Sequence, residues 1–124
     1  MLIKAVSIVA PSSSRIASGE KTIEVRRWSP DLDIHEDLLI VENQQVLNES
    51  NQHDPDGHAV AVVKIANIRP FRPDDIDAAC ASYYEDGWFA WEISDVRALA
   101  EPFSAIAFRK IYQLDIDDKY LKEK

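Results

Sequence analysis

Apolar and polar residues alternate with a period of two along two N-terminal segments, which is the pattern of β-strands with two different faces. The first segment covers residues 5–10 and stops at Pro11, where a strand is expected to end. The second covers residues 21–28, in which Ile23 and Val25 fall on one face and Thr22, Glu24 and Arg26 on the other. We therefore predict two strands, of which the second separates an apolar face from a charged, outward face.

Later segments predict four more strands. Residues 38–43 and 59–68 are apolar almost throughout, as in strands that are well buried. Between them, residues 43–58 form a long polar connection that ends in the turn-forming sequence Asp-Pro-Asp-Gly. An aromatic strand is expected over residues 87–94, and a long closing strand over residues 104–116.

Two short helices are predicted between these strands. Serines follow Pro11 and can cap a helix that ends at Gly19. Residues 72–84 begin with Pro and Asp, which suit a helix N-terminus, and continue with apolar residues at helical spacing. Residues 96–103 are expected to form a turn or a short helical piece.

The helices are not placed regularly between the strands as β-α-β units require, so the chain is expected to have an α+β fold. A small mixed β-barrel of about six strands with one or two short helices fits this order, because closure hides sheet edges. The 124 residues are enough for one domain. We expect this domain over residues 1–117, followed by a charged, frayed C-terminal tail over residues 118–124.

Composition narrows the class of protein. Hydrophobic residues make up 46% of the chain and charged residues 29%, which are values of a globular domain. The single cysteine, Cys80, allows no internal disulfide and suits a reducing cytoplasm. The apolar run near the N-terminus is shorter than a signal-peptide core, and no run is long enough to span a membrane. A soluble, cytoplasmic protein is expected.

The charge is distributed unevenly along the chain. The net charge is −8, but residues 1–28 contain five basic and two acidic residues, a balance of +3, so the remainder carries −11. An acidic protein is a poor non-specific binder of nucleic acid. A local positive region can still attract a small anionic ligand or a short single strand.

The basic residues near the N-terminus lie in a recognisable pattern. Gly19, Lys21, Glu24 and Arg26 form a G-x-K-x-x-E-x-R run that enters the second strand. This run, with the order of the elements from about residue 3 to residue 116, resembles the ASCH domain, a relative of the PUA fold. The resemblance implies a PUA-like β-barrel with a cleft beside this strand. It also implies that the partner is RNA or a modified nucleoside or nucleotide.

The resemblance leaves an enzymatic function open. A bacterial branch of the family hydrolyses the amide of acetylated cytidine nucleosides with a Lys, a Thr three residues later and a distant Glu. Lys21 matches the Lys, but Glu24 stands at the Thr position, and Glu85 is the candidate for the distant Glu. Other members are ribonucleases. If the chain is a hydrolase of a nucleoside amide or of RNA, Lys21 and Glu24 are the expected catalytic residues.

The acidic composition keeps a third hypothesis open. Dedicated RNA binders are usually basic, whereas this chain has a net charge of −8. The chain could therefore be a protein-interaction domain whose charged strand lies on the surface.

Eight residues are candidates for binding the ligand. Glu24 can accept a hydrogen bond from the exocyclic amine of a base, and Arg26 can bind phosphate or a carbonyl edge through two N–H groups. Alternatively, these two side chains form an ion pair on the barrel wall. The full set is Lys21, Glu24, Arg26, Arg27, Trp28, Asn43, Trp88 and Ser94.

The aromatic and polar candidates also have structural alternatives. Trp28 can stack on a base or plug the end of the barrel. In the later aromatic strand, Trp91 is expected in the core, which leaves Trp88 as the candidate for the cleft. Asn43 and Ser94 lie at or near strand ends, where they can contact a ligand or cap turns.

No metal and no cofactor are expected. The segment from His53 to His58 contains two histidines and two aspartates, but its Asp-Pro-Asp-Gly sequence is typical of a turn. His35 is the only other histidine, so neither a metal centre nor histidine-based catalysis is indicated.

Overall fold

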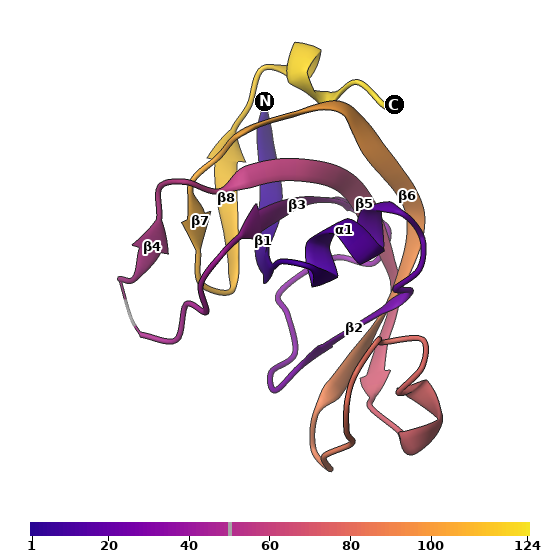
Figure 1. Cartoon of the computed structure of the whole chain (residues 1–124). Coiled ribbons are helices and arrows are strands. Elements are labelled where there is room, and N and C mark those ends of the chain that lie inside the picture. Colours follow the sequence, from indigo (N-terminus) through magenta and orange to yellow (C-terminus); the bar gives the residue numbers. More distant parts are fainter. Residues whose placement is uncertain (50) are drawn as a thin grey trace.

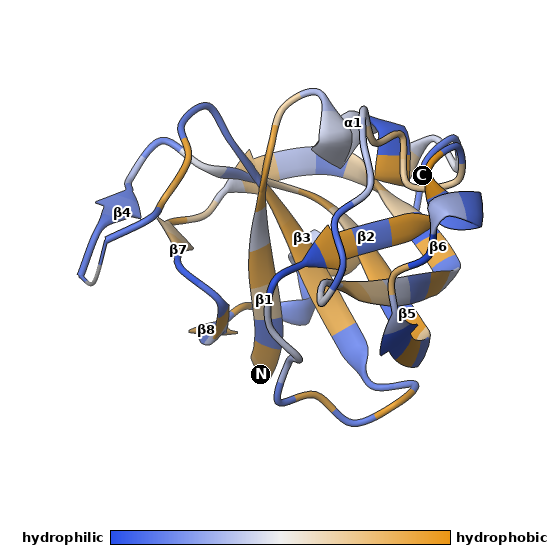
Figure 2. Cartoon of the chain, turned by 90° about the horizontal axis from the view of Figure 1, so that it is seen from below, coloured by the Kyte–Doolittle hydropathy of each residue, from blue (hydrophilic) through white to orange (hydrophobic). Residues whose placement is uncertain are grey.

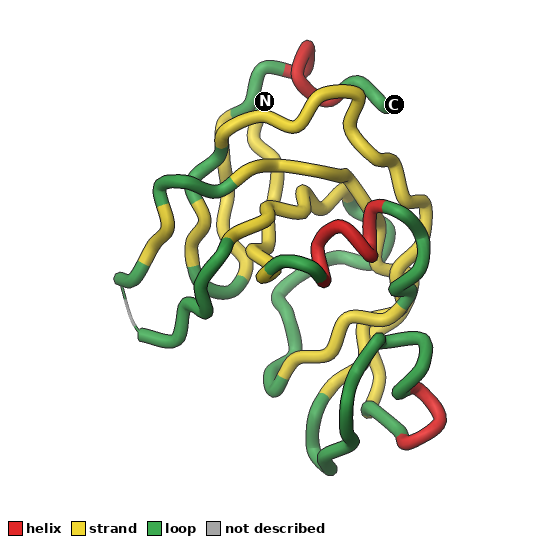
Figure 3. The backbone as a smooth tube through the Cα atoms, viewed as in Figure 1, coloured by secondary structure: helices red, strands yellow, loops and turns green. Residues whose placement is uncertain are grey.

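The computed structural model describes residues 1–49 and 51–124 and consists mainly of strands (Figure 1 and Figure 3). One mixed sheet of six strands has the order β2-β6-β5-β3-β1-β8. Its strands are β1 (Leu2–Val9), β2 (Ile23–Arg26), β3 (Asp37–Asn43), β5 (His58–Pro70), β6 (Phe89–Ser104) and β8 (Ile111–Asp115). The other elements are the paired strands β4 (His53–Asp54) and β7 (Ala107–Phe108), the helix α1 (Ser12–Ala17), and the 3-10 helices η1 (Pro73–Asp75) and η2 (Asp118–Leu121).

The centre of the sheet is buried on both faces. β1 and β3 run parallel, and the other neighbouring strands of this sheet run antiparallel. Leu38 and Ile40 of β3 pack in one apolar cluster. Leu39 and Val41 pack in another, on the opposite face, and all four side chains are at most 1% exposed. The continuous apolar run of β3 follows from this position, because a strand covered on both sides needs apolar residues throughout.

The helix α1 covers part of one face of the sheet (Figure 1). Its Ile16 is fully buried in the same apolar cluster as Val6 and Trp91. Ser13, which is also fully buried, donates a hydrogen bond of 2.7 Å to the Glu42 carboxylate and so attaches the helix to β3. The short serine-rich helix predicted after the first strand is thus present. In Figure 2 the apolar residues follow the strands of the large sheet, whereas β4 is hydrophilic.

The predicted closure into a barrel is not confirmed. β2 and β8 are the two edge strands of the large sheet, and no ladder joins them in the described part of the chain. A turn lies against the free edge of β2 instead: the backbone N–H groups of Thr22 and Ile23 donate to the Ala78 carbonyl over 2.9 and 3.2 Å. The fold is therefore a mostly-strand fold with a mixed sheet and few helices, in which a loop rather than closure protects this edge.

Residues 72–84 form the single 3-10 turn η1 followed by turns, and not the predicted longer helix. Asp75 is held in place by Arg69, which donates two hydrogen bonds of 2.7 and 2.8 Å to its carboxylate. Asp75 also accepts a hydrogen bond from the backbone N–H of Arg72. Cys80 has a φ of 51°, in the left-handed region where helices end. These local constraints override the helical spacing of the apolar residues.

The last strands differ in length from the prediction. Residues 96–103, expected to be a turn or helical, continue β6, because this strand pairs with β5 as far as Ser104. The single strand predicted over residues 104–116 is divided into β7 and β8. The turn between them contains Lys110, whose φ of 57° is incompatible with a continuous strand.

The C-terminal residues 118–124 are part of the structure and not a frayed tail. They include η2, and their backbone pairs with β6. The N–H of Ala100 donates to the Lys122 carbonyl, and the N–H of Lys124 donates to the Ala98 carbonyl, each over 2.7 Å. The charged sequence suggests fraying, but backbone hydrogen bonds do not depend on the polarity of the side chains.

Gly57, just before β5, lies very close to another part of the backbone. Its carbonyl accepts a hydrogen bond of 2.9 Å from the N–H of Ala105. A Cβ at this position would overlap the Ala105 carbonyl oxygen and lie 3.1 Å from the Val41 side chain. Space, and not a special backbone conformation, therefore requires glycine here.

We predict that Gly57→Ala destabilises the protein by roughly 1–3 kcal/mol, because the added methyl group forces two backbone segments apart. Urea unfolding measures this change. Ala100→Ser makes a similarly small change at an exposed position and should shift the free energy of unfolding by less than about 0.5 kcal/mol. Equal stability of the Gly57 variant and the natural chain would contradict the close approach.

Candidate functional site

A cleft of about 680 Å³ opens beside β2. Its walls come from the end of β1, from β2 and the residues after it, from the loop after β3, and from the turn between β7 and β8. Its size is typical of a site for a small molecule or cofactor. The charged and aromatic residues that line it are Glu24, Arg26, Arg27, Trp28, Trp88, Phe108, Arg109 and Lys110.

Lys21, Glu24 and Arg26 form one ion cluster at the start of β2. The Lys21 ammonium lies 3.0 Å from Glu24 Oε1, and Arg26 Nη2 lies 2.9 Å from Glu24 Oε2. Lys21 and Glu24 are only 7% and 6% exposed. The cluster is therefore buried, whereas the sequence pattern places Glu24 on an outward face.

The packing around β2 explains this burial. Glu24 is the register partner of Trp91 in β6, which is fully buried. The N–H of Lys21 donates to the Arg15 carbonyl over 3.0 Å, which attaches the end of α1 to the same region. The alternation of residues separates the two faces of β2. Whether the charged face is exposed or covered depends on the packing of β6 and α1, which bury Glu24.

Glu24 is held in its ionised form. Burial disfavours the charged carboxylate, but the attraction of Arg26 and of Lys21, with hydrogen bonds from both, outweighs burial and lowers the pKa of Glu24 below its ordinary value. Both carboxylate oxygens are engaged by these cations. A carboxyl group in this state is poorly suited to carry a proton near neutral pH.

Arg26 connects the buried cluster to the cleft. Its Nε donates to Glu24 Oε2 over 3.0 Å, and its Nη2 donates to the Ser7 carbonyl over 2.9 Å. The guanidinium carbon lies 5.9 Å from the centre of the Trp91 ring. The side chain remains 24% exposed and lines the cleft. Arg26 is therefore a cation whose orientation is fixed before any ligand arrives.

Two tryptophans of the cleft each lie against a cation. The Lys110 ammonium is 5.7 Å from the centre of the Trp28 ring, and the Arg27 guanidinium carbon is 5.3 Å from that of Trp88. Trp28 also makes an edge-to-face contact with the buried Trp91, at 5.3 Å between ring centres. Both cleft tryptophans are half-buried, and Trp91 belongs to the core as predicted.

Asn43 lies in the wall of the cleft at the end of β3. It is 2% exposed, and its Nδ2 donates a hydrogen bond to the Gln45 carbonyl. Its Oδ1 has no hydrogen-bond partner among the residues that the structure describes. The side chain thus shapes the loop after β3, one of the two roles expected for it.

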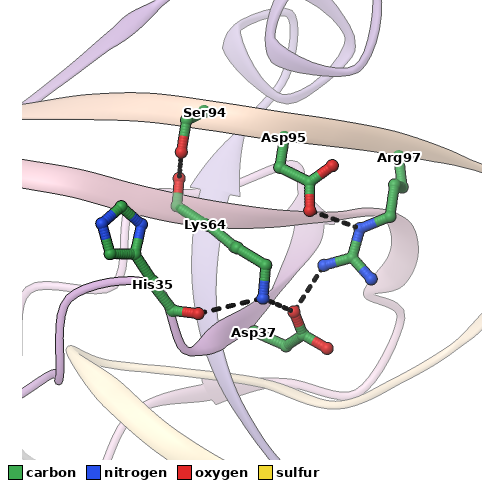
Figure 4. A network of polar contacts seen from close by, with 6 residues as sticks. All are labelled: His35, Asp37, Lys64, Ser94, Asp95 and Arg97. Carbon is green, nitrogen blue, oxygen red and sulfur yellow. Dashed lines mark hydrogen bonds and ion pairs between the residues drawn. The ribbon is translucent and has the colours of Figure 1, made fainter.

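Ser94 lies in a separate polar network (Figure 4). Its hydroxyl donates to the Lys64 carbonyl over 3.3 Å. The Lys64 ammonium donates to Asp37 Oδ1 over 2.9 Å, and Arg97 donates to the same oxygen, so the network joins β5 and β6 to β3. None of the six residues drawn in Figure 4 lines the cleft. Ser94 therefore takes part in holding the sheet together.

Two other residues considered for catalysis also lie outside the lining of the cleft. Lys21 is buried below it in the ion cluster. Glu85 is exposed in the loop before β6. The cleft therefore contains only Glu24 of the three positions that the amidohydrolase branch would use.

The sequence pattern did not indicate that the end of β7 and the turn after it contribute to the cleft. Phe108 of β7 and Arg109 and Lys110 of the turn line it, and β1 adds Ser7. The Ser7 hydroxyl donates to the Phe108 carbonyl over 2.9 Å, which attaches the turn to β1. The available signal in the sequence was an aromatic residue followed directly by two cations.

In residues 1–49 and 51–124, no group of three or more His, Cys, Asp or Glu side chains is arranged to hold a metal ion. Asp54 instead accepts a hydrogen bond of 2.9 Å from the backbone N–H of Asp56, which is turn geometry. Across the same residues, no helix is long and apolar enough to cross a membrane. One position of the polar connection, residue 50, lies outside the described residues.

Comparison with known proteins identifies the relatives of this chain. The sequence model of the ASCH domain matches residues 6–103. The crystal structure of ASCH from Zymomonas mobilis is similar, with a TM-score of 0.63 and 16% identity over 82% of this chain and 72% of that chain. Two point mutants of that protein have TM-scores of 0.64 and 0.59, at 15% and 16% identity. The first of these alignments covers 90% of this chain and 87% of the mutant chain, and the second covers 82% and 74%, respectively.

A search of curated proteins found no match. The likeness to the Zymomonas mobilis structures, at 15–16% identity, shows the fold alone.

We predict that Glu24→Gln destabilises the protein by about 3 kcal/mol, because it leaves the buried Lys21 ammonium without its carboxylate. Urea unfolding at neutral pH measures the effect. Glu20→Gln is the matched control, since this carboxylate is 63% exposed and lies 3.6 Å from Arg15. It should change stability by less than about 0.5 kcal/mol. Similar stabilities of the two variants would show that the buried cluster contributes little.

Acid is expected to destabilise the protein through its paired carboxylates. Burial opposes ionisation of Asp37, but hydrogen bonds from Arg97 and Lys64 lower its pKa below the ordinary value of 3.8. Because the pKa of this carboxyl group is lower in the folded than in the unfolded protein, the group stabilises the fold at a pH above its unfolded pKa. This stabilisation is lost as the pH falls through its pKa in the folded protein. Asp37→Asn should therefore lower the urea midpoint at pH 7, and this difference should shrink as the pH falls below 3.8. A constant difference would contradict this origin.

Proposed function

Because the chain belongs to the ASCH domain family, we propose that it binds single-stranded RNA or a modified nucleotide in the cleft beside β2. The observation that carries this proposal is the charge of the cleft. Four cationic side chains and one carboxylate line it, a balance of +3, although the whole chain carries −8. Concentrating positive charge in one concave place attracts an anionic ligand to that place.

The aromatic residues support a ligand that contains a base. Trp28 and Trp88 lie in the cleft with part of their surface exposed. A base can stack on an indole ring, and this contact contributes roughly 1–3 kcal/mol per base in single-strand binders. Cations and aromatic rings in one cleft match a ligand that carries both a phosphate and a base.

The ion cluster has a supporting role in this proposal. Lys21 and Glu24 hold Arg26 against the Ser7 carbonyl, and Arg26 faces the ligand. A cation fixed in this way loses less conformational entropy on binding than a free side chain. Lys21 is therefore a positioning residue and not a direct ligand contact.

Hydrolysis receives less support from the site. Lys21 is engaged by Glu24 and does not line the cleft, and Glu85 lies outside it as well. Glu24 stands where the amidohydrolase branch has a Thr, and its carboxylate forms an ion pair with Lys21. The Lys21 ammonium is therefore paired and not free to act on a substrate. This weighs in favour of binding over amide hydrolysis.

Arg109→Gln is predicted to weaken binding of a short single-stranded RNA about tenfold, because one cationic hydrogen-bond donor is lost from the cleft. Fluorescence anisotropy with an unstructured, labelled RNA measures the affinity. No ion pair of Arg109 occurs among the described residues, so the variant should unfold at the same urea concentration as the natural chain.

Lys122→Gln removes an exposed cation that does not line this cleft and serves as the matched control. It should leave the affinity within about twofold, since a distant exposed charge is largely screened. Equal affinities of the two variants, or no RNA binding by the natural chain, would reject RNA binding in this cleft and favour a protein-interaction domain.

A further inference from the structure

The cleft contains the same combination of groups twice. Trp28 with Lys110 forms one aromatic–cation pair, and Trp88 with Arg27 forms the other. All four side chains line the cleft. The two pairs come from three separate parts of the chain: the residues after β2, the residue before β6, and the turn between β7 and β8.

Each tryptophan of the two pairs also contacts a second aromatic ring. Trp28 makes an edge-to-face contact with the buried Trp91, with 5.3 Å between the ring centres. Trp88 makes an edge-to-face contact with Tyr83, with 5.7 Å between the ring centres. The contact with the buried Trp91 restricts the Trp28 indole and reduces the entropy lost when a base stacks on it, whereas Tyr83 is 55% exposed and restricts Trp88 less.

Arg26 lines the cleft together with both pairs, of which Trp28 packs on the Trp91 side and Trp88 on the Ile23 side of β2. It stands two positions before Trp28, and its register partner in β6 is Phe89, the residue after Trp88. Its guanidinium is already fixed by Glu24 and Ser7. A guanidinium in the same cleft as both tryptophans can bind a phosphate that links two nucleotides.

We propose that the cleft binds two consecutive nucleotides of a single strand, one base on Trp28, the next on Trp88, and the linking phosphate at Arg26. This rests on the proposed function and makes it more specific. The repeating unit of a nucleic acid is one base and one phosphate, and the two aromatic–cation pairs repeat in the same way. A mononucleotide would use only one of them.

Charge limits the site to this length. The cleft residues contribute +3, so the remaining residues carry −11 at neutral pH. The rest of the chain is acidic in sum, so phosphates beyond the cleft are expected to gain no further net attraction. Affinity should rise from one nucleotide to two and then level off.

Isothermal titration with 5′-phosphorylated oligoadenylates of one, two, three and six nucleotides tests the proposal. Two nucleotides should bind at least about fivefold more tightly than one, since a second stacked base is added. The step from two to six should be less than about threefold, because each further phosphate adds repulsion rather than contact.

Variants of the two cations test the roles of the pairs. Arg27→Gln and Lys110→Gln should each reduce the preference for two nucleotides over one to less than about twofold, because one pair is lost. Both side chains are exposed, so the variants should remain folded. Lys119→Gln is the matched control: this ammonium lies 5.1 Å from the Tyr120 ring, outside the cleft. It should leave the length dependence unchanged.

The outcomes separate this inference from the proposed function. Equal affinities for one and two nucleotides, or an affinity that keeps rising to six, would overturn the two-nucleotide site while leaving RNA or nucleotide binding in place. An unchanged preference in both cleft variants would also overturn it. No binding at any length would reject RNA binding in the cleft, on which the inference rests, and the inference with it.

Discussion

The carboxylate of Glu24 is buried between Lys21 and Arg26, and the arrangement of β2 depends on this contact. A buried carboxylate is very unfavourable unless it is paired and hydrogen-bonded. Here both oxygens are satisfied by cations from the same short run of sequence. The result is a charged strand that can pack against the fully buried Trp91 and still present Arg26 to the cleft.

The G-x-K-x-x-E-x-R run can be understood as one structural unit. Gly19 has a φ of 84°, and its N–H donates to the Ile16 carbonyl, so it ends α1 and turns the chain toward β2. Lys21 and Glu24 then form the buried pair, and Arg26 is the member that orients toward the cleft. Gly19, Lys21 and Glu24 therefore serve mainly to position Arg26.

The electrostatic character of the cleft depends more on where the charged side chains lie than on the net charge of the chain. Carboxylates away from the cleft are used to hold strands together, as Asp37 does with Lys64 and Arg97. Of the cleft cations, Arg27 and Lys110 lie over tryptophan rings and have no ion pair among the described residues, whereas Arg26 both pairs with Glu24 and lies over Trp91. An acidic protein can in this way keep one positive concave site.

Local sequence determined the elements with strong patterns: the apolar strands β1, β3 and β5, the serine-rich helix, and the two faces of β2. It also indicated Arg26, Trp28 and Trp88 as cleft residues. Tertiary structure decided what those patterns leave undetermined. It buried Glu24, left the sheet open, and brought the turn of residues 108–110 to the cleft. Periodicity depends on neighbouring residues, whereas which face is covered depends on contacts between segments far apart in the chain.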